Sequence, residues 1–231
     1  MSSICIAAPS GSGKSTSYGN FPELGIKGLD PEETFIINVA SKDLPFKGWK
    51  KKYRVKDKDF KGNYYEGSDA VAITKIIEGI SSSRPDIKNI VIDDGQYTLS
   101  FEFMKRANEK GYQKFSDIGV NISKIVEAAR NSRKDLKVFF LWHPEKTADG
   151  GLKLKTIGNM IDNYLTLEGL FTVILYGRVE KDLDGKINYQ FITNNDGVYP
   201  AKAPIGMFPE IYIKNDLGLV SELIERYNEE E

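Results

Sequence analysis

"IAAPSGSGKSTSYG", residues 6–19, carries the pattern Ala-x-x-x-x-Gly-Lys-Ser from Ala8 to Ser15, directly after the apolar run "ICIAA". Glycines at this spacing let successive backbone N–H groups point inward around a phosphate. The lysine then reaches the β- and γ-phosphates, and the hydroxyl of the next residue ligates Mg²⁺. The stretch therefore predicts a phosphate-binding loop with ATP and Mg²⁺ as ligands.

The residues of this loop have separate expected roles. Lys14 should contact the phosphates and act in catalysis, and Ser15 should ligate Mg²⁺. We expect a short helix over residues 14–19, whose dipole would favour the anion, and a Lys14 side chain that faces solvent in the empty loop. The expected nucleotide contacts are Pro9, Ser10, Gly11, Ser12, Gly13, Lys14, Ser15 and Thr16.

A second motif, "IKNIVIDDGQYTL", is an apolar run that ends in Asp93 and Asp94. A carboxylate at the end of a strand beside the phosphate loop can hold Mg²⁺ through water, and we assign this role to Asp93. Asp94 stands where many ATP hydrolases carry a glutamate that orients the attacking water. An aspartate pair that only caps the next helix is the alternative.

The next apolar run, "KVFFLWHPEK", ends in the only histidine of the chain, His143. Simple nucleotide kinases usually place the strand of the metal-binding aspartate next to the phosphate-loop strand. RecA-type ATPases insert one strand between the two, and that strand ends in a polar side chain. We therefore expect His143 to contact the γ-phosphate or the attacking water, although a lone histidine can be purely structural.

The order of apolar and helical segments predicts an α/β fold with a parallel sheet flanked by helices, and the phosphate loop at its start is typical of a P-loop NTPase. A β-hairpin around Asp184-Gly185 and a closing helix should follow near the C-terminus. The expected strands are 3–8, 34–39, 89–93, 137–142 and 171–177, and the expected helices are 14–19, 68–82, 96–109, 114–133 and 154–167. We expect one domain over 1–231, with a basic and aromatic insertion at about 42–67.

Composition limits the function classes. The chain has 231 residues, 40% hydrophobic and 28% charged, with a net charge of −1, which gives no overall attraction to nucleic acid or membrane. The single cysteine, Cys5, suits a reducing compartment. "MSSICIAAP" lacks a basic segment followed by a long apolar one, so we expect a soluble cytoplasmic protein without membrane partners.

The order of motifs resembles that of the RecA-like phage ATPases described as an "AAA domain" family, which includes single-strand annealing ATPases of the Sak-four type. The matching segments are "APSGSGKST", "VIDD", "FFLWHPE" and "TNNDGVYPAKAPIGMF". The resemblance implies a RecA-like core, ATP with Mg²⁺, a homo-oligomeric ring or filament, and single-stranded DNA as partner. It also implies recombination or replication proteins of a phage as partners, in the bacterial host cytoplasm.

One departure from this family leaves other functions open. RecA-type enzymes usually carry a catalytic glutamate at the end of the second strand, where "FIINVASKD" offers Asn38 and then Asp43. Hydrolysis is then expected to be slow or to rest on Asp94. The alternatives are a small-molecule or nucleotide kinase, although no arginine-rich lid is visible, and an ATP-binding switch or helicase loader with little turnover.

Two segments are candidates for contact with single-stranded DNA, which needs positive charge and aromatic platforms. "PEKTADGGLKLKTIG" offers Lys146, Lys153 and Lys155 around Gly150-Gly151. The insertion offers Trp49, Lys50, Lys51, Lys52, Tyr53 and Arg54, and a solvated charged hairpin is its alternative. Candidates for a cation that reaches the nucleotide of a neighbouring subunit are Arg178 and Lys202.

Overall fold

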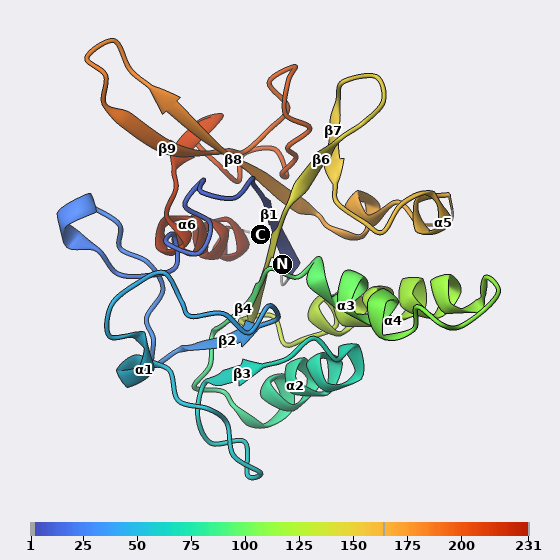
Figure 1. Ribbon diagram of the computed structural model, residues 1–231. Helices are drawn as coiled ribbons and strands as arrows, with labels where there is room; N and C mark the ends of the chain where they lie inside the picture. Colours follow the sequence, from blue (N-terminus) through green and yellow to red (C-terminus); the bar gives the residue numbers. More distant parts are fainter. Residues whose placement is uncertain (1–2, 164, 231) are drawn as a thin grey trace.

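The computed structural model describes residues 3–163 and 165–230, and a large sheet with helices on both faces forms its centre (Figure 1). The strands are β1 (Ser3–Ala7), β2 (Thr34–Asn38), β3 (Tyr64–Glu66), β4 (Asn89–Asp93), β5 (Lys137–Trp142), β6 (Pro144–Lys146), β7 (Leu152–Leu154), β8 (Val173–Lys181), β9 (Ile187–Ile192) and β10 (Tyr212–Lys214). The helices are α1 (Trp49–Lys52), α2 (Ala70–Ser83), α3 (Tyr97–Lys105), α4 (Gln113–Arg130), α5 (Asn159–Asp162) and α6 (Leu217–Glu229), with 3-10 turns η1 (Pro22–Leu24) and η2 (Leu167–Leu170).

The large sheet has the strand order β10-β9-β8-β1-β5-β4-β2-β3. Its neighbours pair in parallel from β8 through β3, whereas β9 and β10 extend it antiparallel. The protein therefore has a mixed α/β fold with a mostly parallel central sheet. β5 lies between β1 and β4, as expected from the motif order, so the carboxyl ends of these three strands meet at one edge of the sheet.

Two apolar cores explain why the parallel strands read as continuous hydrophobic runs. On one face, alternate residues such as Cys5, Ile92 and Phe140 pack against the apolar stripes of α2, α3 and α4. On the other face, residues such as Ile6, Val91 and Phe139 pack in a core that includes α6. Both faces of the central strands are therefore buried.

The expected helix over residues 14–19 is wrong. The segment after the loop makes a single helical turn, in which the Ser17 N–H donates to the Gly13 carbonyl at 2.9 Å, and then turns away. Ser, Thr and Gly have low helix propensity, and the Ser17 hydroxyl bonds the Lys14 carbonyl at 2.6 Å. Local side-chain bonds of this kind compete with helix continuation.

The expected helix over residues 154–167 is also largely wrong; residue 164 of this range lies outside the described residues. Leu154 belongs to β7, which pairs with β6 in a separate two-stranded sheet. Only the short α5 and η2 follow. Gly158 has a left-handed φ of 100° before α5, which a residue with a side chain rarely adopts, and this position keeps a helix from beginning earlier.

The insertion at 42–67 belongs partly to the core of the fold. Its last residues form β3, which adds a parallel edge strand to β2. Its aromatic residues Trp49, Tyr53 and Tyr64 are buried in the same core as α6. The Arg84 guanidinium stabilises the bend at 60–62 by donating to the Phe60 and Gly62 carbonyls at 2.6 and 2.9 Å.

The C-terminal part follows the expected pattern. β8 and β9 form a long hairpin whose turn contains Asp184 and Gly185, the latter with a φ of 82°. α6 begins at the cap residue Asp216, which accepts from the Gly218 N–H at 2.9 Å. Among the described residues, none of the helices has both the length and the apolar character that crossing a bilayer requires.

Candidate functional site

The predicted phosphate loop, residues 8–16, follows β1 and contains two glycines in left-handed conformations. Gly11 and Gly13 have φ values of 79° and 83°, in the left-handed region that favours glycine. Within residues 3–163 and 165–230, no group accepts a hydrogen bond from the backbone N–H of Ser10, Gly11, Gly13, Lys14, Ser15 and Thr16. These backbone donors around a concave turn are therefore available to an anion.

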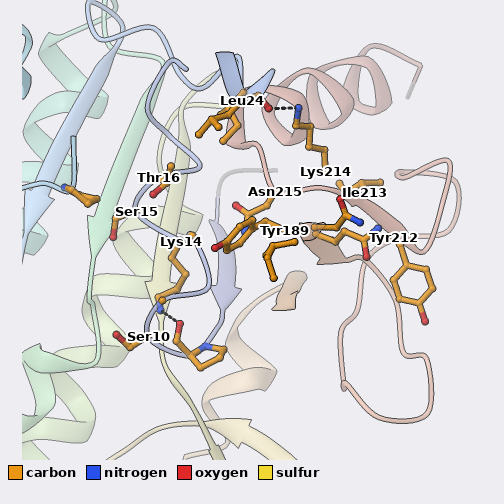
Figure 2. Close-up of a pocket in the computed structure, with 18 of the residues that line it drawn as sticks. Ser10, Lys14, Ser15, Thr16, Leu24, Tyr189, Tyr212, Ile213, Lys214 and Asn215 are labelled. Atoms are coloured by element: carbon orange, nitrogen blue, oxygen red, sulfur yellow. Dashed lines mark hydrogen bonds between the residues drawn. The ribbon is translucent and has the colours of Figure 1, made fainter. Parts of the chain in front are cut away.

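Lys14 does not face solvent, contrary to our expectation, because only 6% of its surface is exposed. Its ammonium group donates to the carbonyls of Ala8 and Pro9 at 2.5 and 3.1 Å and so closes the loop from inside (Figure 2). Burial lowers the pKa of Lys14 to about 8, against the opposing effect of the Asp94 and Asp93 carboxylates. The loop thus holds a buried cation beside its free N–H groups.

Ser15 and Asp93 lie together, as the sequence predicted. The Ser15 hydroxyl donates to Oδ1 of Asp93 at 3.0 Å, and the Tyr18 hydroxyl donates to Oδ2 at 2.9 Å. Asp93 is buried at the end of β4, and burial followed by the charge of Asp94 raises its pKa. Tyr18 was not identified from the sequence, since no motif marks it.

The oxygen atoms at this point fit Mg²⁺. A hydroxyl and a carboxylate are hard ligands, and Mg²⁺ in nucleotide sites takes one or two of these together with phosphate oxygens and waters. Among the described residues, no three His, Cys, Asp or Glu side chains form a cluster able to hold a metal ion. Ser15 and Asp93 are therefore the residues that would hold Mg²⁺ with a nucleotide.

Asp94 lies between two cationic or polar partners. His143 Nε2 lies 3.2 Å from its Oδ1, and the Lys42 ammonium contacts its Oδ2. Burial alone would raise the pKa of Asp94, but His143 and Lys42 hold it well below its usual range. Asp94 has a φ of 58°, a left-handed conformation that is uncommon outside glycine and recurs at functional sites.

Lys42 is a site residue that sequence reasoning missed. It follows the end of β2, whose last residue Asn38 lies in register with Asp93 of β4. The turn at Ser41, with a φ of 52°, directs the chain back toward the site. No local pattern marks this lysine, because its contact with Asp94 depends on β2 lying beside β4.

Asn38 cannot replace the missing glutamate as a general base, because an amide does not accept a proton, and its side chain is held in place by two hydrogen bonds. Its amide nitrogen donates to the Lys42 carbonyl at 2.6 Å and to the Tyr64 hydroxyl at 2.7 Å. Tyr64 in turn donates to Glu66 at 2.8 Å. Asp43 is exposed and pairs with Lys50 at 3.2 Å. Among the described residues, Asp93 and Asp94 are thus the two carboxylates beside the predicted phosphate loop.

A cavity of about 890 Å³ connects the phosphate loop to the C-terminal strands (Figure 2). One end is lined by Lys14, Ser15, Lys42, Asp94 and His143. The other end is lined by residues of η1, β9 and β10 that no motif predicted, among them Leu24, Ile187, Tyr189, Tyr212 and Ile213. Asp93 lies behind Ser15 and does not line the cavity.

Asn215, directly after β10, fixes the loop from the C-terminal side. Its amide nitrogen donates to the Ser12 carbonyl at 2.9 Å. A Cβ atom at Gly13 would lie 3.3 Å from the Asn215 amide and from the Tyr189 ring, so space is tight there, and the φ of 83° itself favours glycine. The Leu217 N–H donates to the Ser17 carbonyl at 2.9 Å.

The aromatic platforms expected for DNA in the insertion are not exposed. Trp49 and Tyr53 are only 8% and 3% accessible and contribute to the core, so neither can stack on a base. The spacing of α1 turns these aromatic residues inward, while Lys50, Lys51 and Lys52 are exposed. The insertion therefore offers exposed charge without exposed rings at these positions.

The second DNA candidate, residues 144–158, begins with the β6–β7 hairpin. Lys153 pairs with Asp162 at 2.5 Å and with Glu145 at 3.2 Å, so its charge is balanced. Lys146 and Lys155 are exposed, and neither forms an ion pair with another described residue. Two of the three predicted lysines thus remain as free positive charge.

Arg178 and Lys202 do not line the cavity of their own chain. The Arg178 guanidinium lies over the Tyr212 ring, 4.2 Å from its centre, and contacts Glu180. Lys202 donates to the Glu168 carbonyl at 2.8 Å. A role for either in a neighbouring subunit remains a prediction.

Comparison with protein-family models gave no match, and comparison with curated proteins gave no significant relative. The resemblance to RecA-like phage ATPases therefore remains a prediction that rests on the motifs and on the site geometry.

Proposed function

We propose that this protein is a RecA-like P-loop ATPase that binds ATP with Mg²⁺ and acts on single-stranded DNA in recombination or replication. The observation that carries the ATP part is the meeting of Lys14, Ser15 and Asp93 beside a loop of free N–H donors. The position of β5 between β1 and β4, ending at His143, favours the RecA-type strand order over that of simple nucleotide kinases.

The residues have distinct roles in this proposal. The loop N–H groups and the Lys14 ammonium bind the phosphates, and Lys14 leaves the Ala8 and Pro9 carbonyls when it does so. Ser15 and Asp93 hold Mg²⁺, which neutralises charge on the phosphate oxygens. Asp94 and His143 position the attacking water, with Asp94 ionised because its pKa is held low.

Support for single-stranded DNA as partner is narrower. The exposed lysines of α1 and of the β6–β7 segment supply positive charge, as a phosphate backbone requires. Assembly into a ring or filament, and contact with phage recombination or replication proteins, rest on the resemblance. These parts of the proposal are therefore tested separately from ATP binding.

An ATP-binding switch or helicase loader with little turnover is the second candidate. The observation that favours it is the state of the two positions where a catalytic carboxylate was expected. Asn38 replaces the usual glutamate and is held by Lys42 and Tyr64, and Asp94 is engaged by Lys42 and His143. A carboxylate that already has two partners is a poor acceptor for the proton of a water molecule.

The test is ATP hydrolysis measured with and without single-stranded DNA at two salt concentrations, alongside direct ATP binding. Stimulation by DNA that weakens at higher salt supports the RecA-like proposal. ATP binding without turnover in either condition favours the switch, and phosphate transfer to a nucleoside monophosphate identifies a kinase. Absence of ATP binding contradicts all three.

A further inference from the structure

The cavity is larger and less polar than a phosphate site needs. Beyond the loop its lining includes the apolar and aromatic side chains of Leu24, Ile26, Ile187, Tyr189, Tyr212 and Ile213, together with the polar ones of Glu23, Lys186, Asn188, Gln190 and Lys214. The apolar and aromatic side chains suit a flat heteroaromatic ring better than charged phosphates. The two ends of the cavity therefore differ in chemistry, as those of a site for a nucleotide do.

Tyr189 stands where these two ends meet. A Cβ atom on Gly13 would lie 3.3 Å from its Cδ1 atom, so the ring borders the loop that would enclose the phosphates (Figure 2). Tyr189 is 45% exposed, and no aromatic ring or cation of the described residues stacks on it. Tyr212 differs, since Arg178 already occupies one of its faces.

The opposite wall is held in place by a contact across the chain. Lys214 donates to the carbonyls of Leu24 and Gly25 at 2.8 and 2.7 Å, which ties η1 to β10. Figure 2 shows Leu24 at the top and Tyr189 below it, with Asn215 beside Tyr189. The apolar end is thus bounded by segments linked to each other.

Asn215 adds a polar group at the same place. It is 3% exposed and donates to Ser12, and its Oδ1 is buried without a hydrogen-bond partner among the described residues. An unpaired buried amide oxygen costs free energy unless a ligand or water satisfies it. Its amide nitrogen, like the Tyr189 ring, lies next to Gly13, so Asn215 borders the same point of the loop.

We propose that this end of the cavity is the nucleobase subsite, with the base stacked on Tyr189 against the apolar side chains of Leu24, Ile26 and Ile187. This inference rests on the proposed function, because it assumes that the triphosphate occupies the loop. It assigns to Tyr189 the role of a ligand-contact residue that distinguishes a nucleoside triphosphate from the triphosphate alone. Stacking on an aromatic ring serves any base, so the subsite recognises nucleosides as a class.

The experiment is calorimetric titration of the wild type, Tyr189→Ala and Tyr189→Phe with ATP and with inorganic tripolyphosphate, both with Mg²⁺. Tyr189→Ala should weaken ATP binding by about tenfold or more and leave tripolyphosphate binding within about twofold. Tyr189→Phe keeps the ring and should retain ATP affinity. Tyr112→Ala, which removes an exposed tyrosine that does not line the cavity, is the matched control.

The outcomes separate this inference from the proposed function. Equal loss of ATP and tripolyphosphate in Tyr189→Ala would mean that the tyrosine supports the loop, and unchanged ATP affinity would mean that no base stacks there. Either result overturns the inference alone. If the wild type binds neither ligand, or if Lys14→Ala binds both as well as the wild type, the phosphate site itself is wrong and the inference falls with it.

Discussion

The hydroxyl of Ser15 donates to the carboxylate of Asp93 at 3.0 Å, although 78 positions separate the two residues in the chain. The contact joins the predicted phosphate loop to the end of β4. It places the two proposed Mg²⁺ ligands within hydrogen-bond distance of each other.

Replacing Asp93 should therefore remove the dependence of ATP binding on Mg²⁺. We expect Asp93→Asn, which keeps the size of the side chain, to bind ATP about equally with Mg²⁺ and with EDTA, because a charged ligand of the ion is gone. The measurement is the ratio of the two dissociation constants. Asp86→Asn, at an exposed carboxylate paired with Arg84, should keep the wild-type ratio. A wild-type ratio in Asp93→Asn would contradict the metal role.

The lowered pKa of Lys14 predicts that the affinity for ATP depends on pH. Because burial lowers its pKa to about 8 in the free protein, the ammonium loses its proton as pH rises above that value. Bound phosphate favours the charged form, so ATP affinity should fall by up to about tenfold per pH unit above about 8. ATP itself is already fully ionised there.

This dependence is measured by titration with ATP in EDTA between pH 7 and pH 10. Lys14→Ala should bind ATP weakly and with little change over the same range, since the titrating cation is gone. A wild-type affinity that stays constant up to pH 10 would show that Lys14 does not bind the phosphates.

Lys42 supplies a second cation at the phosphate end of the cavity, from the same chain. If it stabilises charge on the transferred phosphate, Lys42→Ala should lower kcat on the order of a hundredfold. Lys42→Arg should recover part of the loss. Lys47→Ala, at an exposed lysine of the same segment outside this cavity, should have wild-type kcat. Equal kcat values for Lys42→Ala and Lys47→Ala would exclude the role.

Two sets of substitutions in the insertion at 42–67 should separate its contribution to the stability of the protein from a contribution to DNA binding. Trp49→Ala should lower the free energy of unfolding by about 3 kcal/mol or more, because it empties a buried site beside Tyr64. The triple variant Lys50→Ala, Lys51→Ala, Lys52→Ala should change stability little and weaken single-stranded DNA binding, most at low salt. Chemical denaturation and DNA titration are the two measurements. A triple variant with wild-type DNA affinity would remove α1 from the DNA-binding surface.

The parts of the site that lie within a single segment could be predicted from the local sequence. One strand precedes the loop, one ends at Asp93 and one precedes His143. All three are short apolar runs bounded by turn residues, and such runs predict strands without knowledge of the rest of the fold. The order of strands was expected from the motifs, because the strand after β4 in the chain, β5, is followed directly by the polar residue His143.

The parts that were missed depend on distant segments. Lys42 reaches Asp94 only because β2 pairs with β4, and Asn215 reaches Ser12 only because the last strand passes the first loop. The burial of Trp49 inside a run of lysines also has no local signature, since α1 is too short to show a helical period. The expected helix at 14–19 failed because hydroxyl side chains bonded the backbone locally.

The order in which the site is assembled follows from Asn215. Asn215 donates to the Ser12 carbonyl, the Leu217 N–H donates to the Ser17 carbonyl, and Asp216 accepts from the N–H groups of Lys27 and Gly28. The loop and the segment after it are thus held by the part of the described chain that a ribosome makes late. A nascent chain that has not yet presented Asn215 lacks the support of the loop, even with β1, β4 and β5 already made. Nucleotide binding would then report complete synthesis of this segment, and a product cut before it would retain the motif without the means to hold it in shape.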